Sequence, residues 1–159
     1  MGSKFIAQFT GVAKTAAGDL FELIAPATYS LILHEVKITQ STESGDAQSE
    51  QITIAIKRAT GTYTSGSGGT TPTAVPLNFL GAAYTGTVEA NNTTPASAGT
   101  GALATLLSIS EHVQLGLHYL PTPELRFECG GANAFVVSLV STPADSITFD
   151  GYIIFEVVG

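Results

Sequence analysis

The fold class of this 159-residue chain is decided by two segments, Tyr29-Ser-Leu-Ile-Leu-His-Glu-Val-Lys-Ile-Thr39 and Gln51-Ile-Thr-Ile-Ala-Ile-Lys-Arg58. In the second segment isoleucine occupies every other position from Ile52 to Ile56, which is the two-residue period of a half-buried strand. β-branched residues suit such a pleated surface. We expect partner strands joined by the polar, acidic link 40–50, which is long for a hairpin.

The first segment changes phase along its length. Leu31 and Leu33 share one phase, whereas Val36 and Ile38 share the other. A β-bulge at residues 34–35 would reconcile the two phases, because a bulge adds one residue to a strand. The alternative is a strand that is buried on both faces.

Short alternating segments recur outward from this centre, and no convincing amphipathic helix accompanies them. The further expected strands are residues 4–10, 19–24, 83–89, 112–119, 125–129, 135–139 and 146–157. Residues 59–105 differ, because low-complexity polar stretches surround only brief apolar returns at Leu77, Phe79 and Leu80. Ordering such a stretch costs about 1–2 kcal/mol per residue, so we expect it to be mobile or ordered by a partner.

The pattern predicts a single all-β domain over residues 1–159. We expect a jelly-roll-like β-sandwich of roughly eight to ten short strands, with residues 59–105 as a long loop-rich insertion. An immunoglobulin-like sandwich is the second interpretation, but the chain has no Trp and only one Cys.

Composition excludes several classes of function. A net charge of −7 with only six Lys and Arg residues argues against a nucleic-acid partner. No apolar run approaches the ~20 residues of a membrane span, and Met1–Lys4 runs directly into a strand pattern without a signal peptide. Charged residues make up 12% of the chain, against a usual ~25%. Because subunit interfaces are depleted in charge, we expect a homo-oligomer.

Candidate metal and acid–base sites give weak signals. His112 and His118 would lie about 20 Å apart in one strand, which is too far for one ion. His34 and Glu35 are adjacent and so are expected on opposite faces. Cys129 is in phase with core residues, which predicts an inert buried thiol.

Two loops contain residues that partly resemble ligand-binding motifs. Glu43, Asp46 and Glu50 are interpreted as a solvated acidic turn rather than a Ca²⁺ loop, because the hand-type pattern is missing. Gly66-Ser-Gly-Gly69 lacks the Lys of a phosphate-binding loop and is interpreted as flexible. We therefore predict no catalytic, cofactor-binding or metal-binding residue, and no enzyme.

Several motifs carry a resemblance to a known group of proteins. They are Ser41…Gly45-Asp46…Glu50–Arg58, Thr64-Ser-Gly-Ser-Gly-Gly…Thr71-Pro-Thr73, Val88-Glu-Ala-Asn-Asn-Thr-Thr94 and Tyr119-Leu-Pro-Thr-Pro-Glu124. The chain resembles small proteins encoded beside capsid genes in tailed bacteriophages, similar to head decoration or cement proteins. The resemblance implies a β-rich, commonly trimeric unit that is made in the host bacterial cytoplasm. That unit would be seated on the capsid exterior against the major capsid protein.

The resemblance transfers no functional residue, so contact residues are predicted from the segments themselves. The predicted partner-contact residues are Phe5, Phe9, Tyr63, Tyr84, Asn91 and Asn92. The alternative is that these aromatic residues fill the core. The competing function is a carbohydrate- or receptor-binding module of a tail or fibre, which predicts exposed aromatic residues along a groove; the absence of Trp counts against it.

Overall fold

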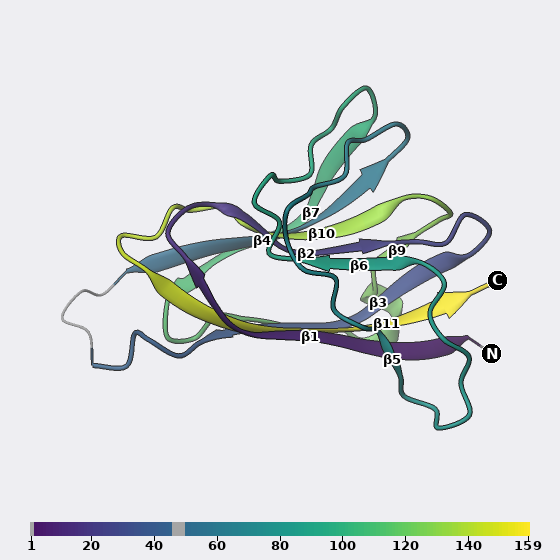
Figure 1. Cartoon of the computed structure of the whole chain (residues 1–159), viewed down its shortest axis with the longest axis horizontal. Coiled ribbons are helices and arrows are strands. Elements are labelled where there is room, and N and C mark those ends of the chain that lie inside the picture. Colours follow the sequence, from purple (N-terminus) through teal and green to yellow (C-terminus); the bar gives the residue numbers. More distant parts are fainter. Residues whose placement is uncertain (1, 46–49) are drawn as a thin grey trace.

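Two antiparallel sheets lie face to face and enclose the core (Figure 1). The computed structural model describes residues 2–45 and 50–159. Sheet A has the order β5-β1-β11-β3-β8, with β9 also paired to β3, and sheet B has the order β6-β2-β10-β4-β7. The strands are β1 (Ser3–Lys14), β2 (Gly18–Ile24), β3 (Ser30–Gln40), β4 (Gln51–Thr60), β5 (Val75–Pro76), β6 (Thr87–Ala90), β7 (Ala102–His112), β8 (Leu117–Tyr119), β9 (Glu128–Cys129), β10 (Ala134–Leu139) and β11 (Ile147–Val158).

The pairing is that of a jelly roll. First strands pair with last strands in a nested series: β1 with β11, β2 with β10, β3 with β8 and β4 with β7. Successive members of the series alternate between the two sheets. This is the double Greek key of a jelly roll, and the predicted all-β sandwich is confirmed. Among the described residues the one helical element is a 3-10 turn, η1 (Pro123–Leu125), and no helix is long and apolar enough to cross a membrane.

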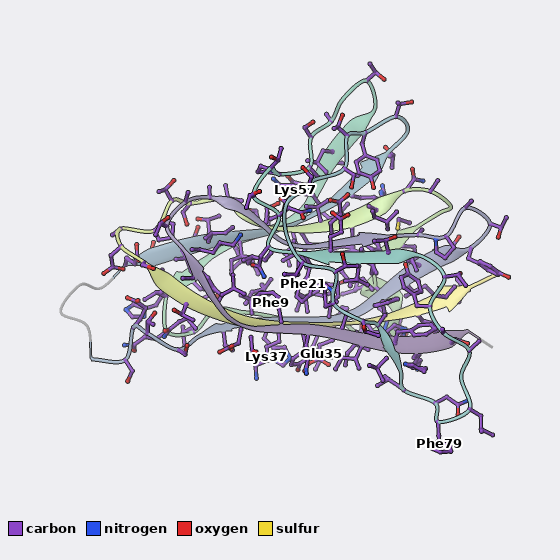
Figure 2. The ribbon with its side chains drawn as sticks, in the orientation of Figure 1. Phe9, Phe21, Glu35, Lys37, Lys57 and Phe79 are labelled. Atoms are coloured by element: carbon purple, nitrogen blue, oxygen red, sulfur yellow. The ribbon has the colours of Figure 1, made fainter. Side chains whose placement is uncertain are left out.

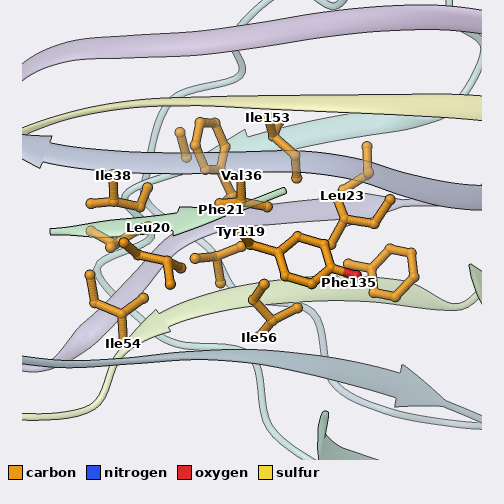
Figure 3. Packing of buried hydrophobic residues seen from close by; sticks show 14 of the residues in the cluster. Leu20, Phe21, Leu23, Val36, Ile38, Ile54, Ile56, Tyr119, Phe135 and Ile153 are labelled. Carbon is orange, nitrogen blue, oxygen red and sulfur yellow. The ribbon is translucent and has the colours of Figure 1, made fainter. Parts of the chain in front are cut away.

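The expected pairing of the two central segments is wrong. β3 belongs to sheet A and β4 to sheet B, so they face each other across the core instead of sharing hydrogen bonds. Figure 3 shows Val36 and Ile38 on one side of the core, with Ile54 and Ile56 on the other. Each strand has one apolar face, and placing the two faces opposite each other buries both.

The expected bulge in β3 is confirmed. Its pairing with β11 skips one residue, because Ile154 pairs with Glu35 and Phe155 pairs with Leu33. The extra residue, His34, lets Leu33 and Val36 both reach the core. A second such irregularity lies at Leu20 of β2, between the pairs Ser138–Asp19 and Val137–Phe21.

Aromatic rings fill the centre of the sandwich. Phe21, Phe135, Phe149 and Phe155 are fully buried. Gly151, inside β11, lies where side chains of two neighbouring strands come close to the backbone. A Cβ at Gly151 would lie 2.8 Å from Cδ1 of Ile38 and 2.9 Å from Cε1 of Phe9.

The expected strand over residues 112–119 is wrong. β7 ends at His112, a turn closed by the bond from Leu115 N to His112 O follows, and β8 starts only at Leu117. The sequence pattern did not predict β7. Its pairing with β4 shifts register between Leu107 and Thr105, and this shift breaks the alternation of apolar and polar residues that marks a strand. The loop-rich connection therefore spans residues 61–101.

This connection, residues 61–101, is here called the strap. It places β5 at the edge of sheet A beside β1 and β6 at the edge of sheet B beside β2. Two passes of the strap also run antiparallel to each other, with bridges Thr64–Ser97, Ser67–Thr94 and Thr70–Ala90. The segment is thus ordered by contacts within its own chain. The sequence had suggested only two possibilities, a mobile segment or one ordered by a partner.

Candidate functional site

The part of the outer face of sheet B over β2 and β10 is covered by the strap. Ala59 and Val136 are fully buried although they lie outside the core cluster between the sheets. Asp19 and Glu22 of β2 are buried on the same face, because the irregularity at Leu20 turns both side chains outward. This part of the face is therefore closed by the chain's own backbone and polar side chains.

Glu22 fastens the strap at its first pass. Oε1 accepts a hydrogen bond from Ser65 Oγ at 2.8 Å, and Oε2 accepts bonds from Gly66 N at 2.8 Å and Asn92 Nδ2 at 3.2 Å. Burial raises the pKa of Glu22, and the bonds from Ser65 and Gly66 oppose that rise. A raised carboxyl pKa is typical of an acid catalyst, but Glu22 is 0% exposed, so a substrate cannot reach it.

Asp19 fastens the returning pass. Oδ2 accepts a bond from Ala96 N at 2.6 Å, and Oδ1 accepts one from Ser138 Oγ at 3.0 Å. Burial raises the pKa of Asp19, and these two bonds lower it. Sequence reasoning missed both acids; the available signal was a pair of carboxylates inside an otherwise apolar strand.

Two of the predicted contact residues are core residues. Phe5 and Phe9 are 3% and 7% exposed. Phe5 stacks on Phe155 with ring centroids 5.6 Å apart, and Phe9 packs on Phe21 at 5.0 Å. Both rings fill the core, as the alternative interpretation held.

The other four predicted contact residues lie in the strap. Tyr63 and Tyr84 are half-buried, and burial raises the pKa of each. The Tyr84 hydroxyl donates to the carbonyl of Ile24. Asn92 is buried and donates from Nδ2 to Glu22 and to Glu89, whereas Asn91 is buried at a φ of 58°. These residues tie the strap to the sandwich.

The histidines are arranged differently from the expectation. His112 and His118 lie in different sheets, on β7 and β8. The prediction that His34 and Glu35 face opposite sides is wrong, because the bulge turns both toward the outer face of sheet A. His34 meets Glu156 and Glu35 meets Tyr152, and both partners alternate with buried residues of β11.

The outer face of sheet A therefore carries two histidine–carboxylate pairs (Figure 2 shows Glu35 and Lys37 pointing away from this face). Glu35 Oε1 lies 2.9 Å from His118 Nε2 and accepts from Tyr152 Oη at 2.6 Å. His34 Nε2 lies 2.9 Å from Glu156 Oε2. Burial would raise the pKa of Glu35, but bonds from Tyr152 and His118 hold it below its ordinary value. Burial lowers the pKa of His34, although its hydrogen bond to Glu156 acts to raise that pKa.

The lowered pKa of Glu35 argues against one catalytic role, that of a general acid. Glu35 with a lowered pKa is an ionised acceptor, and a general acid needs a pKa near the working pH. Cys129 is buried, as predicted, and burial raises the pKa of its thiol to about 12, so it is not a nucleophile at neutral pH.

One acidic cluster meets the spacing of a metal site. Glu43, Glu50 and Asp145 each offer a carboxylate oxygen within 4.8 Å of the others. Glu43 is 4% exposed, so the expectation of a fully solvated turn is wrong for this residue. Asp46 lies outside the described residues. Ca²⁺ takes six to eight oxygen ligands, and three clustered acids alone do not identify a metal centre.

An exposed apolar loop projects beside the edge of sheet A, and Phe79 lies at its tip (Figure 2). This apolar loop, residues 75–80, exposes Val75 by 53%, Leu77 by 52%, Phe79 by 98% and Leu80 by 87%. Three hydrogen bonds fix its shape: Leu77 N to Lys4 O, Gly81 N to Asn78 O and Leu80 N to Asn78 Oδ1. The sequence marks Leu77, Phe79 and Leu80 only as a brief apolar return within a loop-rich segment, and their exposure was not predicted.

A hollow of about 260 Å³ lies next to the loop. Its apolar lining includes Phe5, Tyr29, Tyr84 and Val157. Residues 82–85, which are separated from the loop by Gly81, form another part of the wall. None of the residues lining the hollow carries a charged side chain.

No protein-family description, curated protein or solved structure matches this chain.

Proposed function

We propose that this chain is a structural virion protein that binds the exterior of a tailed-phage capsid as an oligomer and stabilises the shell. The observation that carries the proposal is the distribution of charge. Between Arg58 and Glu111 the one charged residue is Glu89, although this stretch supplies the strap and the apolar loop. Charge-depleted surface is suited to being covered by protein.

The fold and the anchored strap support the same function. Jelly rolls serve as viral capsid domains and as lectins. A capsid-binding subunit needs a rigid body whose loops hold their shape, and Asp19 and Glu22 fix the strap without a partner. The outer face of sheet A, with its histidine–carboxylate pairs, is left as a polar surface for the major capsid protein.

Binding to capsids tests the proposal directly. The purified chain is mixed with phage heads that lack it, the heads are sedimented, and the bound protein is quantified and located by electron microscopy. We expect saturable binding at regular positions on the outer surface and a higher temperature of head disruption. Heads that bring down none of the chain would refute the proposed function.

A carbohydrate-binding module is a second candidate, favoured by the aromatic residues Tyr29 and Tyr84 in the hollow. The hollow offers the hydroxyls of Ser3, Tyr29 and Thr85, while the Tyr84 hydroxyl is already bonded to Ile24 O, and no amide or charged side chain lines it. Sugar recognition requires several such groups. Reproducible glycan-array hits that are lost in Tyr29→Ala, without capsid binding, would favour this function.

A further inference from the structure

The apolar loop and the hollow form a projection and a recess in one region of the surface. Phe79 and Leu80 project, and residues 82–85 turn back to form part of the wall of the hollow. Two copies of one chain can use such a pair reciprocally, with the projection of each in the recess of the other, or head to tail around a ring.

The projection has the properties of a preformed anchor. Phe79 is 98% exposed, so its ring is almost free of contacts within its own chain. The turn beneath it is closed by the bonds from Gly81 N and Leu80 N to Asn78, so little conformational freedom is lost on docking. Rigid aromatic side chains that fill a recess are the usual centres of binding energy at protein interfaces.

The recess has matching chemistry. Its lining includes the aromatic residues Tyr29, which is 43% exposed, and Tyr84, together with Val157, and aromatic rings pack favourably on one another at such sites. Its volume of about 260 Å³ accommodates a side chain rather than a large ligand.

Charge favours a second copy as the occupant. Each copy carries a net charge of −7, so two copies repel over most of their surfaces. From Ala59 to Val88 the chain has no charged residue, and none of the residues lining the hollow has a charged side chain. The charged residues beside this region are Lys4 and Glu156, which line a neighbouring hollow with Leu77 and Asn78 and carry opposite charges. Two like-charged copies therefore approach at low electrostatic cost through this region.

We propose that this chain self-associates by inserting Phe79 of one copy into the hollow formed by Phe5, Tyr29, Tyr84 and Val157 of another. The inference deepens the proposed function and rests on its subunit assembly. The contact is tested without capsids, so the two ideas can fail separately.

The first experiment measures mass by sedimentation equilibrium at micromolar concentration. We expect the unaltered chain to give a multiple of 16.3 kDa and Phe79→Lys to give 16.3 kDa. The matched control is Leu115→Lys, at a residue that is 68% exposed in the β7–β8 turn, and it should assemble like the unaltered chain. Because both side chains are exposed, circular dichroism should show an unchanged fold in both variants.

The second experiment identifies the recess. Thr85→Glu places a carboxylate on the wall of the hollow and should give a monomer by itself. Mixing Phe79→Lys with Thr85→Glu brings the introduced ammonium group of one copy to the introduced carboxylate of the other, so the mixture should regain the oligomeric mass. Three results would overturn the proposal: a monomeric unaltered chain, a Phe79→Lys variant that still assembles, or a mixture that stays monomeric. Capsid sedimentation of Phe79→Lys then reports on the proposed function separately.

Discussion

On the outer face of sheet B, Asp19 and Glu22 are sealed beneath the strap, whereas on the outer face of sheet A, Glu35 and Glu156 pair with histidines at the surface. Both sets of carboxylates occupy outward positions of strands. Burial raises the pKa of Glu22, while hydrogen bonds from Tyr152 and His118 hold that of Glu35 down against the effect of its burial. An outward acid becomes a structural anchor where its own chain covers it and stays available to a partner where the face is open.

The largest effect is expected from Glu22→Ala. The change leaves Ser65, Gly66 and Asn92 without their shared acceptor, so the free energy of unfolding should fall by about 2–4 kcal/mol. The matched control on the open face, Glu35→Ala, should cost less than about 1 kcal/mol, because its bonds are near solvent. Urea denaturation measures both, and equal losses would erase the distinction between the two faces.

A smaller loss is expected from Gly69→Ala, which tests how closely the two passes of the strap lie. A Cβ at Gly69 would lie 2.2 Å from Ala90 O and 2.8 Å from Asn92 N, so the backbone must shift. We expect a loss of about 1–3 kcal/mol in thermal unfolding. Gly18→Ala is the control; its nearest neighbour would be 3.8 Å away, so the change should stay within about 0.5 kcal/mol.

Opposite responses to pH should separate the faces. The folded-state pKa of Glu22 is raised above 4.5, so its contribution to stability is present at low pH and is lost as pH rises through that value. The pKa of Glu35 is lowered, so its contribution is present at higher pH and is lost as pH falls. Asp19, whose pKa burial also raises, remains in both variants. Between about pH 3 and pH 7 the urea midpoint of Glu22→Gln should therefore fall less with rising pH than that of the unaltered chain, and the midpoint of Glu35→Gln should fall less with decreasing pH. Parallel pH curves for both variants and the unaltered chain would contradict this assignment.

The smallest effect is expected from Tyr152→Phe. It removes the bond from Tyr152 Oη to Glu35 Oε1 on the open face, which should cost about 0.5–1 kcal/mol. A double-mutant cycle with Glu35→Gln isolates the coupling energy of the pair. A loss as large as that of Glu22→Ala would mean that the open face is as important to the fold as the covered one.

The local alternation of apolar and polar residues was enough to predict several features of the structure. The alternation at Ile52–Ile56 predicted a strand, the phase change in β3 predicted the bulge near His34, and the phase of Cys129 predicted its burial. These features depend on neighbours in sequence, because side chains two residues apart share a face of a strand. The same reasoning failed for β7, whose register shift breaks the alternation.

The candidate contact surface was much less predictable. Phe5 and Phe79 are both aromatic residues in short apolar contexts, yet one is 3% exposed and the other 98%. The difference arises because β1 lies between β5 and β11 in sheet A, while the apolar loop passes the edge of that sheet without a covering strand. No local pattern encodes that difference.

By itself, the sequence determined that the chain forms an all-β sandwich with one charge-depleted region, because the two-residue period and the composition are properties of the chain alone. Only the tertiary structure decided that β3 and β4 lie in opposite sheets, that Asp19 and Glu22 hold the strap, and that Phe79 stands beside an uncharged hollow. Those arrangements depend on contacts between residues distant in sequence. Such contacts form only when the nested strand pairs assemble into the two facing sheets.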